Sequence, residues 1–290
     1  MEEELKKRVS TAGIMVGIVL LTAALALWNP AFNWIFLSLG FIAVAFAAFE
    51  YASIQRVPES STGTKVIYFV GLFLPQLGSV ATLASIDLYS AQQHIELGLL
   101  IPLFLTFCSF FIGILSLVID GRKSLDLAAA FARDYFIGLF LVGLCGSLLI
   151  ELAVLPGAPR HIIWLLLIVC VNDSAAYFVG KSIGGPKLAP NISPGKTISG
   201  AIGGLLGGMI IGAVFYRLIP QIPDVKFALF FAFVIVICAQ LGDLGKSFYK
   251  RVHGVKDTGS ILPGHGGILD RIDGLLAAAP VLYLFAYVML

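Results

Sequence analysis

Apolar runs long enough to cross a bilayer recur along almost the whole chain, and they constrain the fold more than any other feature. A helix needs about 20 mostly apolar residues to span the hydrocarbon core. The sequence offers nine candidates, separated by polar residues, prolines or glycines, at about 11–28, 31–49, 66–86, 97–119, 135–155, 162–180, 199–219, 227–242 and 274–290. We therefore predict an all-α fold, a polytopic integral membrane protein with about nine transmembrane helices.

Composition excludes a soluble globular domain. Hydrophobic residues make up 59% of the chain, charged residues 12%, and the mean hydropathy is +0.96, whereas soluble domains are about half apolar and a quarter charged. The net charge of +2 does not indicate nucleic acid as a partner. The first run resembles a signal peptide, but it is longer than a typical signal core, and we interpret it as an uncleaved span.

The distribution of Lys and Arg predicts the orientation, because cytoplasmic loops of membrane proteins carry an excess of both. With a cytoplasmic N-terminus, only three of the 19 lie outside, namely Arg160, Arg217 and Lys226. The other 16 lie inside, five of them between residues 243 and 273. This distribution predicts a multi-pass protein of the inner (cytoplasmic) membrane whose charged loops face the cytoplasm.

Two regions follow from the position of the charged loops. Residues 1–160 form an N-terminal transmembrane region, and residues 161–290 form a C-terminal transmembrane region that has cytoplasmic loops 181–198 and 243–273 and holds the candidate catalytic residues described below. The helix predicted at 199–219 has glycine at every fourth position from 200 to 212, which makes a smooth face for close helix packing. That face suits packing within one subunit or a homodimer contact.

The most charged segment runs from Gly242 to Gly274 and suits the binding of a polyphosphate through divalent metal. Counted with both ends, it holds four aspartates, five cations and eight glycines. Carboxylate and phosphate oxygens are the ligands that Mg²⁺ prefers, while Lys and Arg neutralise the remaining phosphate charge. Asp243, Asp270 and Asp273 are the candidate metal ligands.

Asp270 and Asp273 are three residues apart, so they share a face in the first turn of the last predicted helix. The helix dipole favours negative charge at that position, and Gly266 and Gly267 supply flexible backbone whose N–H groups can approach phosphate. The alternative is an interfacial cluster held by internal salt bridges.

A second candidate phosphate site lies in "SPGKT", residues 193–197, directly before a predicted helix. Ser193, Lys196 and Thr197 would grip phosphate at the helix N-terminus; the alternative is an ordinary basic loop with a helix cap. Asp173 lies inside an apolar run, where an unpaired carboxylate is costly. It is predicted to face a polar cavity or to pair with a lysine.

These residues together resemble a known signature. Ser247, Lys250-Arg251, Lys256-Asp257, Leu262-Pro263, His265-Gly266-Gly267 and Asp270-Arg271-x-Asp273 resemble the phosphatidate cytidylyltransferase (CDP-diacylglycerol synthase) family. "DSAAYFVGK" and "SPGKT" extend the resemblance over most of residues 165–280. Three positions depart from it: Lys246 stands where an acidic residue is expected, Tyr249 where an aliphatic residue or Met is usual, and Gly274 where serine is common.

The resemblance implies transfer of CMP from CTP to phosphatidate, with Mg²⁺ as cofactor and room for a second cation. It implies metal binding by Asp243, Asp270 and Asp273, and phosphate binding by Lys250, Arg251, Lys256 and Arg271. Asp257 would orient the lysines, and His265 would donate to phosphate or orient its loop. A CTP-dependent polyprenol or lipid kinase and, from another class, a membrane transporter are the alternatives.

Overall fold

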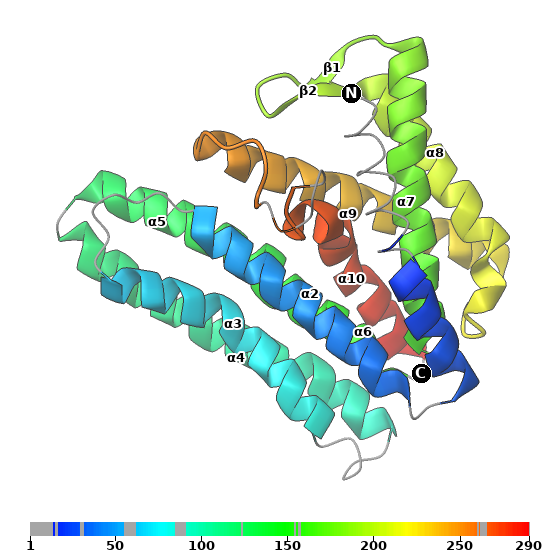
Figure 1. The fold of residues 1–290 in the computed structure, drawn as a ribbon, viewed down its shortest axis with the longest axis horizontal. Helices are drawn as coiled ribbons and strands as arrows, with labels where there is room; N and C mark the ends of the chain where they lie inside the picture. Colours follow the sequence, from blue (N-terminus) through cyan, green and yellow to red (C-terminus); the bar gives the residue numbers. More distant parts are fainter. Residues whose placement is uncertain are drawn as a thin grey trace.

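The computed structural model of the chain describes residues 14, 17–29, 32–54, 62–84, 91–122, 124–153, 155, 158–259, 261 and 266–289. Nearly all of the regular structure in these residues is helical (Figure 1). A helix over Gly17–Trp28 precedes a group of helices at the left of Figure 1. These are α2 (Asn33–Ile54), α3 (Thr62–Ala84), α4 (Ala91–Gly121) and α5 (Leu125–Gly138), which continues through a π-helical turn (Leu139–Leu144) into α6 (Cys145–Leu152).

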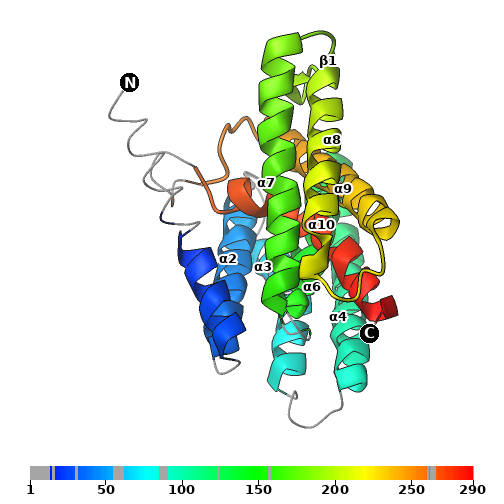
Figure 2. The same ribbon diagram turned by 90° about the vertical axis from the view of Figure 1, so that its right-hand side faces the viewer.

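The C-terminal half places two long helices side by side and joins them through a small hairpin. Figures 1 and 2 both show α7 beside α8, with the hairpin at one end of the pair. α10 packs against α9, α6, α7 and α2, so it lies between the two halves. The elements are α7 (Ala158–Ile183), β1 (Lys187–Ala189), β2 (Ser193–Thr197), α8 (Ile198–Val214), a 3₁₀ turn (Tyr216–Leu218), α9 (Val225–Val252) and α10 (Leu269–Met289).

Both predicted cytoplasmic loops contain more regular structure than expected. In segment 181–198, β1 and β2 pair antiparallel, with Lys187 opposite Thr197 and Ala189 opposite Ser193, so the fold is not purely helical. In segment 243–273, α9 continues to Val252 and α10 begins at Leu269, which leaves only residues 253–268 between helices. Polar residues stay helical there because their charged side chains pair across the two helices.

Helices suited to a bilayer account for most of the structure. Within the described residues, six helices are long and apolar enough to span: Leu37–Ile54, Glu96–Ile119, Leu125–Leu152, Ala158–Ile183, Val225–Val252 and Leu269–Val288. Three shorter apolar helices cover Gly17–Trp28, Val66–Thr82 and Ile198–Val214. Each predicted run overlaps one of these helices. The prediction of a helical membrane protein is confirmed, while nine spans and the orientation stay predictions.

Large apolar side chains point outward from these helices. On α4, Phe104, Phe107 and Leu115 are each 60% exposed or more. Soluble proteins rarely present such contiguous apolar surface to water, so these side chains suit contact with lipid.

The glycine face of α8 is used inside the subunit. Gly200, Gly204, Gly208 and Gly212 are all buried. A Cβ on Gly204 would lie 2.6 Å from Asn172 Oδ1 of α7, and one on Gly208 would lie 2.4 Å from Val236 Cγ2 of α9. The backbone of α8 therefore approaches both neighbours more closely than any larger residue permits.

Replacing Gly204 with leucine is expected to lower thermal stability, because the new side chain overlaps Asn172. Overpacking of this kind costs about 1–3 kcal/mol or more. The melting temperature of the detergent-purified protein measures the effect. Ile202→Leu, at a position of α8 that is 53% exposed, is the control and should leave it unchanged; equal melting temperatures for the two variants would contradict the packing.

Candidate active site

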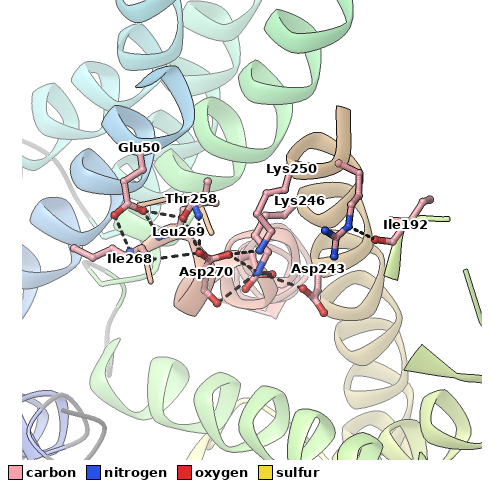
Figure 3. Close-up of polar contacts among 12 residues, drawn as sticks. Glu50, Ile192, Asp243, Lys246, Lys250, Thr258, Ile268, Leu269 and Asp270 are labelled. Atoms are coloured by element: carbon pink, nitrogen blue, oxygen red, sulfur yellow. Dashed lines mark hydrogen bonds and ion pairs between the residues drawn. The ribbon is translucent and has the colours of Figure 1, made fainter. Parts of the chain in front are cut away.

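Three carboxylates from two helices surround the side chain of Lys246. Asp243, Lys246 and Lys250 are spaced by three and four residues, so they share one face of α9. That face meets the first turn of α10 (Figure 3). Lys246 Nζ lies 3.3 Å from Asp243 Oδ1, 3.4 Å from Asp270 Oδ1 and 2.6 Å from Asp273 Oδ2. The two helices thus bring Asp243 and Asp270, predicted to share a site, to the same ammonium group.

Other lysines complete the cluster from outside. Lys250 Nζ lies 2.6 Å from Asp270 Oδ1, and Lys196 of β2 forms an ion pair with Asp243. Asp273 is buried, and its Oδ2 makes no hydrogen bond of good geometry despite its short distance to Lys246. The contact between Asp273 and Lys246 is therefore an ion pair, which depends on charge more than on direction.

Asp270 is also held by the loop that precedes α10. The backbone N–H and the hydroxyl of Thr258 lie 2.8 and 3.0 Å from Asp270 Oδ2. The N–H of Gly267 donates to the same oxygen at 3.4 Å. One oxygen of Asp270 thus faces the lysines and the other faces the loop, which fixes the orientation of the carboxylate.

Glu50 of α2 ties this loop to the N-terminal half. It is 2% exposed and accepts hydrogen bonds from the N–H groups of Ile268 (3.0 Å) and Leu269 (2.9 Å) and from the hydroxyl of Thr258 (3.1 Å; Figure 3). The first N–H groups of a helix have no partner within it, and the helix dipole favours a carboxylate there. Glu50 therefore caps α10 from a distant part of the chain.

The glycines beside Glu50 leave the space that this cap needs. A Cβ on Gly267 would lie 2.3 Å from Glu50 Oε2 and 2.2 Å from Thr258 Oγ1. Gly266 has φ +79°, a conformation that side chains strongly disfavour. Both predicted site glycines are thus required for loop geometry.

The polar end of α9 is anchored to α2 and α5. The ring of Tyr249 stacks on Tyr51, with centroids 4.0 Å apart, and its hydroxyl donates to the Tyr51 carbonyl at 2.9 Å. His253 Nε2 lies 3.0 Å from Asp134 Oδ2. These contacts fix the end of α9 that carries the lysines against α2 and α5. They also give Tyr249, an unusual residue at its position, a defined packing role.

A cavity of about 660 Å³ opens beside the cluster. This volume lies within the range of about 300–1,000 Å³ typical of small-molecule sites. Its lining residues come from α7, the hairpin, α8 and α9. They include Asn172, Asp173, Ser193, Lys196, Thr197, Gln240 and Asp243.

The hairpin residues of the cavity have separate structural tasks. Thr197 is the N-cap of α8, and its Oγ1 accepts a hydrogen bond from Gly200 N at 3.1 Å. Lys196 reaches Asp243, which joins the cavity to the carboxylate cluster. The helix cap of the alternative interpretation is thus present, while phosphate binding by this loop stays a prediction.

Amide side chains line the inner wall of the same cavity. Asp173 accepts a hydrogen bond from Asn172 Nδ2 at 2.9 Å, and Gln240 Nε2 donates to Asn172 Oδ1 at 2.8 Å. The carboxylate of Asp173 thus lies in the cavity lining beside two amide side chains.

The remaining predicted site residues lie at the surface around the loop. Arg251 is exposed and donates to the Ile192 carbonyl of the hairpin turn at 3.2 Å. Lys256, Asp257 and Arg271 are exposed as well. His265 lies outside the described residues.

The carboxylates do not form a ready-made metal cage. No group of three His, Cys, Asp or Glu side chains among the described residues is placed to hold one ion, since Lys246 stands between the aspartates. Protein sites commonly hold Mg²⁺ through one or two carboxylates plus substrate phosphates. Asp243 meets that requirement, because its side chain is 33% exposed and it lines the cavity.

Comparison with known proteins agrees with the sequence signature. The model of the cytidylyltransferase family matches residues 6–289. The chain belongs to this family. The expected family is thereby confirmed over nearly the whole chain, including the N-terminal half, which carries none of the signature residues.

Several bacterial cytidylyltransferase family members named phosphatidate cytidylyltransferase are similar to the chain. The Haemophilus influenzae protein is 30% identical over 99% of this chain and 100% of its own length. The Brucella suis protein is 45% identical over 51% of this chain and 55% of its own, and the Bacillus subtilis protein 42% identical over 49% and 53%. The chain thus spans about half the length of these last two relatives.

Two contributors to the site were not predicted from the sequence. Glu50, which directly follows the apolar run predicted at 31–49, was given no site role, and Lys246 was singled out only as a departure from the family pattern. A carboxylate at the predicted cytoplasmic end of a span was the one available signal for Glu50. No spacing rule connects residue 50 with residue 268.

Proposed function

We propose that the protein is a phosphatidate cytidylyltransferase, which converts CTP and phosphatidate into CDP-diacylglycerol and pyrophosphate for phospholipid biosynthesis. The observation that carries this proposal is the position of Asp243, which lines a nucleotide-sized cavity and also belongs to the cluster with Lys246. Carboxylates and ammonium groups there suit a triphosphate with its divalent ion. The names of the relatives support the same activity.

The chemistry needs positioning and charge stabilisation more than a strong base. A phosphomonoester oxygen of phosphatidate attacks the α-phosphorus of CTP, a new O–P bond forms, and the bond to the β-phosphate oxygen breaks. The electron pair of that bond leaves with pyrophosphate. Such reactions are accelerated by fixed cations aimed at the phosphate oxygens. Lys196 and Lys250 are suited to this task, with Arg251, Lys256 and Arg271 at the rim.

Mg²⁺ is proposed as the cofactor, and it would neutralise phosphate charge and stabilise the leaving group. Asp243 would hold it together with the phosphates, while Asp270 and Asp273 keep the lysines in place. Asp173, Ser193 and Thr197 would contact the nucleotide. Asp257, Gly266, Gly267 and His265 would shape the loop around the phosphates.

We also propose that the site faces the cytoplasm from the inner membrane, with nine spans. The bias of Lys and Arg toward one side supports this orientation. Phosphatidate would then enter from the inner leaflet. A homodimer through α8 would use its outer face, for example Ile202, Leu206 and Ile210, which are each more than half exposed.

Product analysis tests the activity. Purified protein in mixed micelles with CTP, phosphatidate and Mg²⁺ is expected to release pyrophosphate and form CDP-diacylglycerol. Release of CDP with a polyprenol or another lipid acceptor would instead identify a kinase. Chelation of divalent ions should stop the reaction, and undiminished turnover without them would overturn the metal role.

Replacing Lys196 with methionine is expected to raise KM for CTP about tenfold or more, because a charge-assisted contact to phosphate contributes about 1.5–3 kcal/mol. Initial rates at varied CTP measure the effect. Lys226→Met, at an exposed position in the first turn of α9 and outside the cavity lining, is the control and should leave KM unchanged. Equal KM values for wild type and Lys196→Met would remove this residue from the nucleotide site.

A further inference from the structure

Lys246 occupies the position where a cation held by carboxylates is expected. Its ammonium group contacts Asp243, Asp270 and Asp273 within 3.4 Å and also lies 3.5 Å from the Asp270 carbonyl. The residue is only 5% exposed. An ammonium group donates three hydrogen bonds, and the structure surrounds it with three carboxylates from two helices; Figure 3 labels two of them, Asp243 and Asp270.

The cluster is balanced in charge without any metal. A buried charge without partners is costly, and several carboxylates at one place repel one another unless a cation lies among them. The three carboxylates are matched by three ammonium groups that contact them, those of Lys196, Lys246 and Lys250. Little negative charge is left to attract a divalent ion to the centre of the cluster.

We propose that the ammonium of Lys246 is a built-in cation that takes the place of a divalent ion between Asp243, Asp270 and Asp273. The consequence of this inference for catalysis rests on the proposed function. It implies that the free protein binds no divalent ion at the centre of the cluster. The ion that supports catalysis then arrives with the triphosphate at the accessible side of Asp243.

The charge at position 246 predicts the effect of substitution. Lys246→Glu changes the charge of the cluster by two units, which equals the charge of one divalent ion, and adds a fourth carboxylate. Oxygen ligands in that number suit Mg²⁺ or Mn²⁺. The Lys246→Glu variant should therefore acquire a site for a divalent ion that the wild-type protein lacks.

Counting bound Mn²⁺ on the full-length, detergent-purified protein tests the proposal, with no nucleotide or lipid substrate present. Electron paramagnetic resonance of free Mn²⁺ is expected to show one more bound ion per chain for Lys246→Glu than for wild type. Mg²⁺ alone should raise the melting temperature of this variant and leave that of wild type unchanged.

Two further variants separate position from net charge. Lys246→Gln removes the central ammonium and should also bind additional Mn²⁺, more weakly than Lys246→Glu. Lys250→Gln makes the same change in charge at the edge of the cluster, and it should bind no additional ion because Lys246 remains in the centre.

Three results would overturn the proposal. The first is Mn²⁺ binding by wild type that Asp270→Asn abolishes. The second is a folded Lys246→Glu that gains no ion, and the third is a gain by Lys250→Gln equal to that of Lys246→Gln. If Lys246→Glu folds only when Mg²⁺ is present, that dependence supports the proposal; if it never folds, the count on wild type and Lys246→Gln decides. These counts are independent of turnover, so failure of the pyrophosphate assay leaves them standing.

Discussion

The Asp270→Asn variant is expected to lose about 10²–10³-fold in kcat for pyrophosphate release, the range found when one fixed charge-stabilising group is removed from an active site. Asparagine keeps the size of the side chain and can still accept from Thr258. It loses the charge that holds Lys250 at 2.6 Å and Lys246 at 3.4 Å. The two lysines then no longer have fixed positions against the phosphates.

Rates with saturating CTP and phosphatidate measure this loss, alongside melting temperatures that establish folding. Asp126→Asn makes the same chemical change at an exposed position in the first turn of α5, and it should retain wild-type kcat. Turnover by folded Asp270→Asn at the wild-type rate would show that this carboxylate has no part in the reaction.

The Glu50→Ala variant is expected to be less stable by about 2–4 kcal/mol and to lose most of its activity. The substitution leaves the N–H groups of Ile268 and Leu269 buried without their acceptor, at about 1–3 kcal/mol each. It also frees Thr258, which holds Asp270. Both effects act on the first turn of α10.

Kinetics can separate a positioning role for Glu50 from simple loss of folding. Measured well below the melting temperature, kcat should fall while KM for CTP changes little, because the cavity is lined by other elements. Glu50→Gln keeps one acceptor oxygen and should recover part of both activity and stability. If Glu50→Gln and Glu50→Ala lose equal activity and stability, the negative charge at the helix N-terminus matters and the hydrogen bonds to Glu50 do not.

The described helices follow the predicted apolar runs closely, because hydrophobicity over about 20 residues is a local property of the chain. Their ends were predicted less well. α9 extends ten residues beyond the predicted end at residue 242, since Asp243, Lys246 and Lys250 find partners on α10. A prediction from hydropathy alone assigns such charged residues to a loop.

The part of the candidate site that could be predicted consists of residues that lie close together in the sequence. The grouping of Asp270 and Asp273 follows from their spacing on a helix, and Asp243 joins them because α9 and α10 pack together. The hairpin residue Lys196 reaches the same cluster over 47 residues of sequence. The sequence did not predict that ion pair, and the family resemblance covered only the segment that contains Lys196.

The sequence by itself determined the membrane class, the concentration of charge in one segment and the family, because each depends on residue types within short windows. Only the tertiary structure decided that Lys246 stands among three carboxylates, that Glu50 caps a helix more than 200 residues away, and that the glycine face of α8 is internal. Those features depend on which segments meet in space. Contacts between distant segments arise from packing of whole helices, which no short window of sequence contains.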